Sequence, residues 1–250
     1  MPTPQDHVLA AELAERAGAA LLELRERLTA EGAEQRTIKD EGDRVSHELL
    51  MAELTRERPA DAVLSEEARA DEIADTSRLD AERVWIIDPL DGTREYGEGR
   101  ADWAVHVALV EGGVPTAGAV ALPGLGLVLH TGAPPELPPA PDRLRVIVSR
   151  SRPPAEALAI AEGIDADLVE MGSAGAKAMA IVRGEADVYP HSGGQYEWDS
   201  AAPVAVALAA GLHCTRLDGS PLVYNREDPY LPDLLICRPE HAPGVLAVIG

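Results

Sequence analysis

The sequence predicts an α/β protein built from layers of helices and sheets, and three regions of its 250 residues indicate this class. The N-terminal region has helical periodicity, the middle region has short apolar segments separated by turns, and the C-terminal region alternates strand-like with helix-like segments. An element with one apolar face must pack that face against another element. We therefore expect alternating layers of helices and sheets.

Two amphipathic helices are predicted at the N-terminal end. In residues 6–31, apolar side chains recur at helical spacing, and Gly32 is typical of a helix stop. A polar loop is expected at residues 39–44, after which Ser46 caps a second helix that Pro59 ends. The apolar positions of the first helix are Leu9, Leu13, Ala17, Leu21, Leu24 and Leu28.

A mostly antiparallel sheet is predicted in the middle of the chain. Its strands are short apolar segments with turns between them, including "EGG" and "PGLG". Gly124 and Gly126 lie between two of these strands and precede no helix, so we interpret them as a hairpin turn and not as a nucleotide loop. The predicted strands are residues 62–64, 84–87, 103–110, 114–122 and 127–130.

The proline-rich stretch "GAPPELPPAPD", residues 132–142, predicts a stiff connector between two halves. We place an N-terminal α+β half at residues 1–138 and a C-terminal α/β half at residues 139–250. In the second half, strands alternate with helices as in layered α/β folds. The strands are expected at 144–148, 167–169, 186–189, 212–215 and 234–237, and the helices at 155–162, 173–183, 200–210 and 242–249.

Composition restricts the partners and the compartment. The net charge of −21 argues against nucleic-acid polymers and anionic membranes, but it permits a small phosphorylated substrate if divalent cations are bound. No apolar run is long enough to span a membrane, and no basic and apolar leader precedes the first helix, so a cytoplasmic protein is expected. Cys214 and Cys237 are interpreted as buried, inert thiols.

Acidic residues gather at three predicted element boundaries. Glu66 and Glu67 follow one strand, Asp88 and Asp91 follow another, and Asp199 lies at a helix start. Strand ends and helix starts can meet at one cleft, and Mg²⁺ prefers the oxygen ligands that such side chains provide. Each cluster alone is more often a solvated surface or a turn, so the argument depends on their joint occurrence.

The stretch "DPLDGT", residues 88–93, predicts a turn that binds metal and phosphate. Pro89 stiffens the turn, the Leu90 carbonyl can face a cation between the two Asp side chains, and Gly92 and Thr93 would open a helix whose free N–H groups bind phosphate. Phosphatases with an aspartyl nucleophile carry Asp-x-Asp, whereas Asp88 and Asp91 are three residues apart. The spacing favours metal ligands and an attacking water.

Three motifs resemble the inositol monophosphatase superfamily, and further segments are most similar to its 3′(2′),5′-bisphosphate nucleotidases of the CysQ type. The resemblance implies a Mg²⁺-dependent, lithium-sensitive phosphatase with an α/β/α/β/α sandwich fold, and a homodimer. Mn²⁺ accepts the same oxygen ligands. The three motifs are "LSEE" (64–67), "DPLDGTREY" (88–96) and "EWDSAAP" (197–203), and the further segments are "DWAVHVALV", "VSRSR" and "GSAGAKAMAIVRGEADVYP".

The resemblance also implies roles for individual residues. Gly92 and Thr93 hold phosphate, Thr93 and Glu66 activate the attacking water beside Asp91, and Lys177 and Asp199 contact the substrate. The segment "RVSHELL" departs from the family pattern, so either Glu48 holds a third cation or that cation binds less well. Lys39 in "IKDEGD" is a candidate for a mobile flap. The implied ligands for two or three cations are Glu66, Asp88, the Leu90 carbonyl, Asp91 and Asp199.

The substrate remains open at this point. Adenosine 3′,5′-bisphosphate and its sulfated form are favoured, with Lys177, Arg150 and Arg152 as candidate ligands of the 5′-phosphate. Tyr189 and His191 precede a loop expected before Asp199 and can reach a base or sugar. An inositol or sugar phosphate such as fructose 1,6-bisphosphate is the alternative. A regulator without activity gains little support, because all expected ligands are present.

Overall fold

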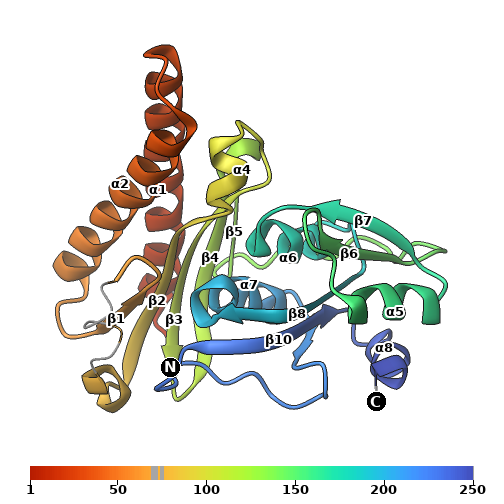
Figure 1. Cartoon of the computed structure of the whole chain (residues 1–250). Coiled ribbons are helices and arrows are strands. Elements are labelled where there is room, and N and C mark those ends of the chain that lie inside the picture. Colours follow the sequence, from red (N-terminus) through yellow and green to blue (C-terminus); the bar gives the residue numbers. More distant parts are fainter. Residues whose placement is uncertain (69–72, 74–75, 250) are drawn as a thin grey trace.

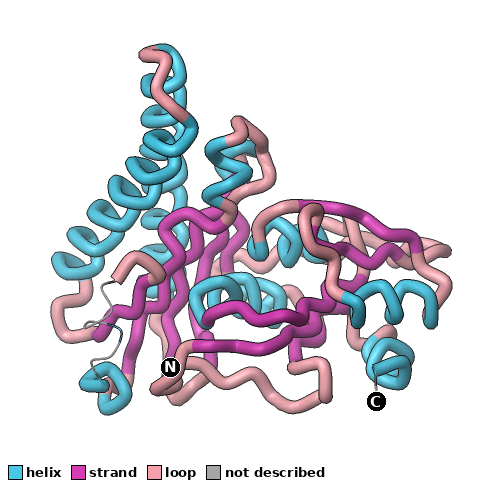
Figure 2. The backbone as a smooth tube through the Cα atoms, viewed as in Figure 1, coloured by secondary structure: helices cyan, strands magenta, loops and turns pink. Residues whose placement is uncertain are grey.

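The computed structural model describes residues 1–68, 73 and 76–249 and has five layers (Figures 1 and 2). Helices α1 (Pro4–Ala30) and α2 (Gln35–Glu57) cover one face of the first sheet. Helices α6 (Ala174–Val182) and α7 (Glu197–Ala209) lie between the two sheets, and α5 (Ala155–Gly163) and α8 (Ala242–Ile249) cover the second. The predicted α/β/α/β/α sandwich is confirmed.

The first sheet has the order β1-β2-β3-β4-β5. Strands β1 and β2 are parallel and the other pairs are antiparallel, which confirms the predicted mostly antiparallel sheet. A 3₁₀ turn at Pro123–Leu125 joins β4 to β5, so Gly124 and Gly126 do form a hairpin turn. The strands are β1 (Ala62–Ser65), β2 (Arg83–Asp91), β3 (Ala104–Glu111), β4 (Val114–Leu122) and β5 (Leu127–His130).

The second sheet has the order β7-β6-β8-β10-β9. Strand β6 runs parallel to β7 and β8, whereas β10 is antiparallel to β8 and β9. Cys214 on β9 and Cys237 on β10 are free thiols whose pKa values are raised by burial. The strands are β6 (Arg145–Ser149), β7 (Asp167–Met171), β8 (Val188–Tyr196), β9 (His213–Thr215) and β10 (Tyr230–Cys237).

The two sheets share a core. Alternate residues of β2 face opposite sides: Trp85 and Ile87 pack toward α1 and α2, whereas Val84 and Ile86 join the cluster around α6 and α7. That second cluster contains residues from both predicted halves of the chain. The boundary at residue 138 stays a prediction. None of the described helices is long and apolar enough to cross a bilayer.

Strand β2 continues through "DPLD", so the turn predicted at Pro89 is wrong. The partner of Asp88 on β3 is His106, and the partner of Asp91 is Ala104, so three steps along β2 match two along β3. In a regular strand, residues three apart point to opposite faces. The irregularity is a β-bulge that brings Asp88 and Asp91 to the same side.

The loop predicted at residues 39–44 is also wrong, because α2 begins at Gln35 and includes this segment. Its apparent helix breaker, Gly42, lies close to other elements: a Cβ there would be 2.8 Å from the Tyr96 ring and 2.9 Å from Leu90. The glycine allows α2 to approach the site closely and does not interrupt the helix. Lys39 is therefore part of a helix, and the flap expected there has no loop from which to form.

Candidate metal centre

Three carboxylates converge where β2 ends and α7 begins. Asp88, Asp91 and Asp199 each offer an oxygen, and these oxygens lie within 4.8 Å of one another. Asp88 and Asp91 are 1 % and 7 % exposed. Buried carboxylates this close repel one another unless they bind protons or a cation. The predicted convergence of the second and third acidic clusters is thus present in the structure.

Asp91 is held as an anion by polar groups of α6 and β3. The Ser173 hydroxyl donates to its Oδ2, as does the Gly175 N–H at 2.6 Å, and the Ala174 N–H donates to Oδ1 at 3.1 Å. His106 Nε2 lies 3.3 Å from the same carboxylate. Burial alone would raise the pKa of Asp91, but His106, Ser173 and Lys177 lower it to about 2.

The sequence analysis did not identify His106. Burial opposes its protonation, but the adjacent Asp91 outweighs burial and raises the pKa of His106. The available signal was a single histidine in an otherwise apolar strand, at the position that pairs with Asp88. A Cβ on Gly175 would be 2.0 Å from His106 Nε2, so only glycine fits beside this imidazole.

Asp88 has an oxygen that the surrounding protein leaves unsatisfied. Its Oδ1 accepts the Leu90 N–H at 3.0 Å, whereas Oδ2 is buried and has no hydrogen-bond partner among the described residues. Burial, Glu66 and Asp91 raise the pKa of Asp88 well above its usual value. An unpartnered buried oxygen beside two further carboxylates fits a hard divalent cation, which prefers oxygen ligands.

Asp199 and Glu66 complete the acidic region. Asp199 Oδ2 accepts the Tyr196 N–H at 2.6 Å, and burial with the charge of Asp91 raises the pKa of Asp199 to about 6. Glu66 follows β1, and its backbone N–H donates to Ile87. Burial of its carboxylate and the charge of Asp199 raise the pKa of Glu66 to about 7, although the residue as a whole is exposed and lies outside the three-carboxylate group.

A proton-accepting pair lies beside the carboxylates. Thr93 Oγ1 is 3.3 Å from Asp43 Oδ1 on α2 and 3.1 Å from the Leu90 carbonyl, so it donates to one of them at a time. Burial and the charge of Glu67 raise the pKa of Asp43 to about 7. Asp43 is not among the predicted site residues, because it lies in the segment 39–44 that was expected to be a loop. The helical spacing of Asp43 from Lys39 was the available signal.

Glu48 does not reach the candidate centre, so its assignment to a third cation is wrong. Its side chain is 61 % exposed and pairs with Arg44 at 2.8 Å. On a helix, the side chain at position 48 points away from the face that carries Asp43. His47, next to Glu48, is partly buried and lies 3.0 Å from the Ser65 hydroxyl.

Two of the three expected phosphate ligands already have partners. Lys177 is buried, and its ammonium donates to the Ser173 carbonyl at 2.6 Å. The Arg150 guanidinium pairs with Glu95 at 2.7 Å and with Glu98 at 2.8 Å. Burial lowers the pKa of Lys177. In this structure, both cationic side chains are therefore bound to groups of the protein beside the site.

The other expected residues lie close to the site. Gly92 has φ +84°, and a Cβ there would be 3.0 Å from Ser173, so this backbone conformation favours glycine. The helix after it, α4 (Thr93–Gly97), has five residues. Tyr189 is buried, and His191 lies farther along β8, which leads directly into α7 without the predicted loop.

The geometry agrees with comparisons to known proteins. A model of the inositol monophosphatase family matches residues 5–247. The chain belongs to this family. A relative from Mycobacterium leprae named 3′-phosphoadenosine 5′-phosphate phosphatase is 51 % identical over 265 aligned positions, covering 98 % of this chain and 93 % of the relative. The family resemblance inferred from the motifs is confirmed.

Two other family members have CysQ in their names. The 3′(2′),5′-bisphosphate nucleotidase CysQ of Escherichia coli K12 is 32 % identical over 203 positions, covering 76 % of this chain and 80 % of that protein. The crystal structure of CysQ from Bacteroides thetaiotaomicron, a bacterial member of the family, superposes with a TM-score of 0.77 at 28 % identity, covering 94 % and 97 % of the two chains. The family fold therefore extends over nearly the whole chain.

Proposed function

We propose that this protein is a divalent-cation-dependent nucleotidase that removes the 3′-phosphate of adenosine 3′,5′-bisphosphate and of its sulfated form. The observation that carries the proposal is the group formed by Asp88, Asp91 and Asp199, with its unsatisfied Asp88 oxygen. The name of the Mycobacterium leprae relative supports the choice of substrate.

The ligands would come from the first sheet and from α7. Asp88, Asp91 and Asp199 would hold the cations, with Glu66 and the Leu90 carbonyl at the edge of the site, and Mg²⁺ or Mn²⁺ suits these oxygen donors. When bound, two or three such cations polarise the phosphate and lower the pKa of the attacking water. Asp91 is already ionised, because His106 and Ser173 hold its pKa low.

Thr93 and Asp43 would remove the proton of the water. When Thr93 Oγ1 donates to Asp43, its lone pairs are free to accept a proton from a water molecule, and the Thr93 proton passes to Asp43. A carboxylate with a pKa of about 7 is well matched to this task near neutral pH. Asp43 thereby joins Glu66 and Thr93 as a proposed catalytic residue.

The phosphate would bind to backbone amides next to the cations. The left-handed conformation of Gly92 changes the chain direction between β2 and α4 and brings the N–H groups of Gly92 and Thr93 beside Asp91. Because α4 has five residues, direct hydrogen bonds contribute more than a helix dipole does.

The test is a phosphate-release assay with adenosine 3′,5′-bisphosphate, its sulfated form, inositol 1-phosphate and fructose 1,6-bisphosphate. We expect the nucleotide to be hydrolysed fastest with Mg²⁺ or Mn²⁺, release to stop in EDTA, and Li⁺ to inhibit. Faster release from inositol 1-phosphate or fructose 1,6-bisphosphate would replace the nucleotidase proposal by that alternative. A chain inert toward all of these substrates would favour a regulatory role.

A further inference from the structure

One face of α2 contacts three of the segments that form the candidate centre. Asp43 reaches the start of α4. One turn later, the Ser46 hydroxyl donates to the Pro89 carbonyl on β2 at 2.6 Å, and His47 Nδ1 lies 3.0 Å from the Ser65 hydroxyl at the end of β1. Positions three and four apart lie on the same face of a helix, so these side chains form one polar row.

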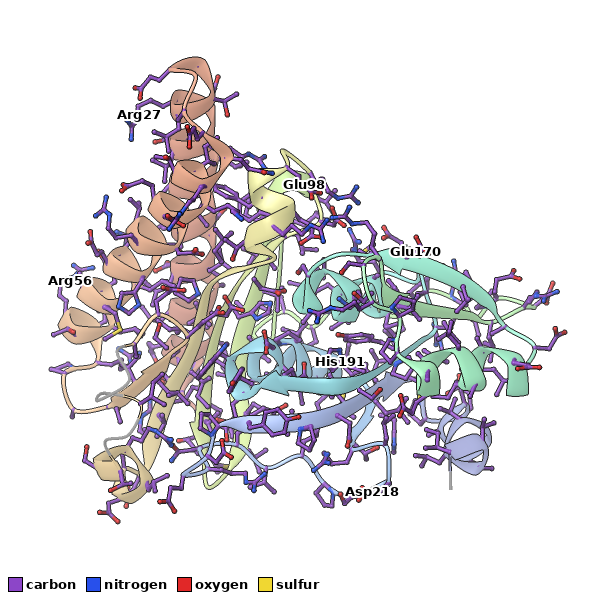
Figure 3. The ribbon with its side chains drawn as sticks, in the orientation of Figure 1. Arg27, Arg56, Glu98, Glu170, His191 and Asp218 are labelled. Carbon is purple, nitrogen blue, oxygen red and sulfur yellow. The ribbon has the colours of Figure 1, made fainter. Side chains whose placement is uncertain are left out.

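The outer face of α2 carries exposed charged side chains instead. Arg56, labelled in Figure 3, points away from the first sheet, and its side chain is 64 % exposed and pairs with Glu53. Ser46 is fully buried and His47 is partly buried, so these two polar residues face the protein. Buried polar groups normally have hydrogen-bond partners, and here both partners belong to segments that carry carboxylates of the centre.

Ser46 binds a carbonyl that the bulge in β2 leaves without a partner on the neighbouring strands. The register of β2 with β3 passes from Asp88 to Asp91, and its register with β1 ends at Ile87, so Pro89 has no partner residue on either strand. A buried carbonyl without a donor is costly, and the Ser46 hydroxyl is the donor here. The bond therefore stabilises the bulge, which brings both carboxylates of β2 to the same side.

His47 holds the end of β1. The buried Ser65 hydroxyl accepts the Glu67 N–H at 3.3 Å, so its own proton can be donated to His47 Nδ1. The N–H of Glu66 donates to the Ile87 carbonyl at 3.3 Å. These bonds fix the backbone on both sides of Glu66, whose carboxylate is the fourth of the acidic region.

We propose that Ser46 and His47 are positioning residues of the metal centre. Ser46 holds the bulge that carries Asp88 and Asp91, and His47 holds the turn that carries Glu66. Groups that orient metal ligands raise cation affinity without touching the cation. The inference deepens the proposed function and depends on it, because it assigns a task to α2 beyond that of Asp43.

The test measures the rise in melting temperature with Mg²⁺ or Mn²⁺, a readout without turnover, and phosphate release from adenosine 3′,5′-bisphosphate. We expect Ser46→Ala and His47→Leu each to raise the cation concentration for half-maximal effect about 10- to 100-fold, the usual result of losing a group that orients a ligand. Phosphate release should fall most at limiting Mg²⁺ and recover as Mg²⁺ is raised. His47→Asn keeps an acceptor near the position of Nδ1 and should restore most of the affinity that His47→Leu loses.

His7→Leu is the matched control. His7 Nδ1 lies 2.6 Å from the Thr131 hydroxyl, so this variant removes the same kind of contact, between α1 and the segment after β5. It should change the melting temperature in EDTA about as much as His47→Leu does. The cation concentration for half-maximal effect and the phosphate release should stay as in wild type, because none of the proposed ligands lies on these segments.

Two results would overturn the inference. In the first, Ser46→Ala and His47→Leu lower the melting temperature in EDTA but leave the half-maximal cation concentration as in wild type, so that both residues only stabilise the fold. In the second, His7→Leu shifts that concentration by the same factor. Failure of the proposed function looks different: the cation would still raise the wild-type melting temperature, but phosphate would be released fastest from inositol 1-phosphate or fructose 1,6-bisphosphate. A wild type whose melting temperature responds to neither cation would overturn both.

Discussion

Buried carboxylates lie near both ends of strand β2, with arginine partners at its start and without them at its end. At its start, Arg83 pairs with Asp6 at 2.8 Å and with Asp61 at 3.1 Å, and Arg58 adds a second cation at 3.0 Å from Asp6. At its end, Asp88 Oδ2 accepts no hydrogen bond from the described residues, and the only cationic group among them within ion-pair distance is the His106 imidazole, at 3.8 Å. The same strand, less than ten residues long, carries both arrangements.

The pKa values record this difference. Burial opposes ionisation of Asp6, but the Thr3 N–H and the two arginines outweigh it and hold the pKa of Asp6 far below its usual range. At the other end, burial and neighbouring carboxylates raise the pKa of Asp88. Buried acids with arginine partners stabilise a fold, whereas buried acids without them repel one another and form a site for cations.

The largest expected effect is on catalysis at the end of β2. Asp88→Asn should reduce phosphate release by at least about 10³-fold, because bound cations supply several kcal/mol of transition-state stabilisation. The same variant should melt at a higher temperature than wild type in EDTA, since buried Asp88 must take up a proton on folding or repel its neighbours, whereas Asn does neither. The assay is phosphate release together with thermal unfolding. If Asp88→Asn were less stable than wild type and still released phosphate, the end of β2 would act in stability as its start does, and the two ends would not differ.

At the start of β2 the reverse is expected. Asp6→Asn should lower the free energy of unfolding by about 3 kcal/mol, because it leaves Arg58 and Arg83 without their shared buried partner. The kcat and the cation dependence should stay as in wild type. Urea unfolding and steady-state kinetics measure the two quantities. A large fall in kcat with unchanged stability would show that this end of the strand acts on the site.

A third change separates proton transfer from cation binding. Asp43→Asn should lower kcat about 10²-fold, the usual contribution of a general base, and should leave the Mg²⁺-dependent rise in melting temperature intact. Thr93→Val should have a similar effect, and the double variant should be little worse than either single variant, because the two groups act in series. Additive losses would contradict the relay.

The smallest effect is a pH dependence of opposite sign at the two ends. In EDTA, Asp199 with a pKa of about 6 and Glu66 with a pKa of about 7 retain protons that the unfolded chain has already lost, so stability should fall as pH rises from 5 to 8. Saturating Mg²⁺ should flatten the slope. Thermal unfolding across pH measures it.

Asp6 titrates the other way. Because its folded pKa lies below the unfolded value near 4, its contribution is present above that value and is lost as the pH falls further. Asp6→Asn should therefore reduce the sensitivity of stability to acid below pH 4 and leave the slope between pH 5 and 8 unchanged. If Asp6→Asn changed the dependence of stability on pH between 5 and 8, the titration of the acids at the two ends of β2 would be linked.

Much of the fold was predictable because hydrophobic periodicity is a local signal. The spacing of the apolar residues predicted α1 and the strands. The motifs around Asp88 and Asp199 predicted that these carboxylates lie close together. The extent of α2 was not predictable in this way. Gly42 and its polar neighbours look like a loop, whereas the glycine is explained by its distance from Tyr96, a contact far along the chain.

The same limit applies to the site. Asp43 was missed because its role depends on the helix that Gly42 obscured, and Glu48 was considered from its place in the motif, which does not show which face of the helix it occupies. The partners of Lys177 and Arg150 are backbone and acidic groups on other elements. Only the packed structure shows that Lys177 and Arg150 already have partners within the protein.

The bulge in β2 makes the site depend on unequal residue counts in two paired strands. Inserting one residue between Ala104 and His106 of β3 would give both strands three steps across this region, restore a regular pleat and turn one carboxylate of β2 toward the opposite face of the sheet. The hydrophobic alternation upstream at Trp85 and Ile86 would survive such an insertion. One inserted residue in β3 would therefore leave a folded sheet without its cation site, although every acidic residue remained in the sequence.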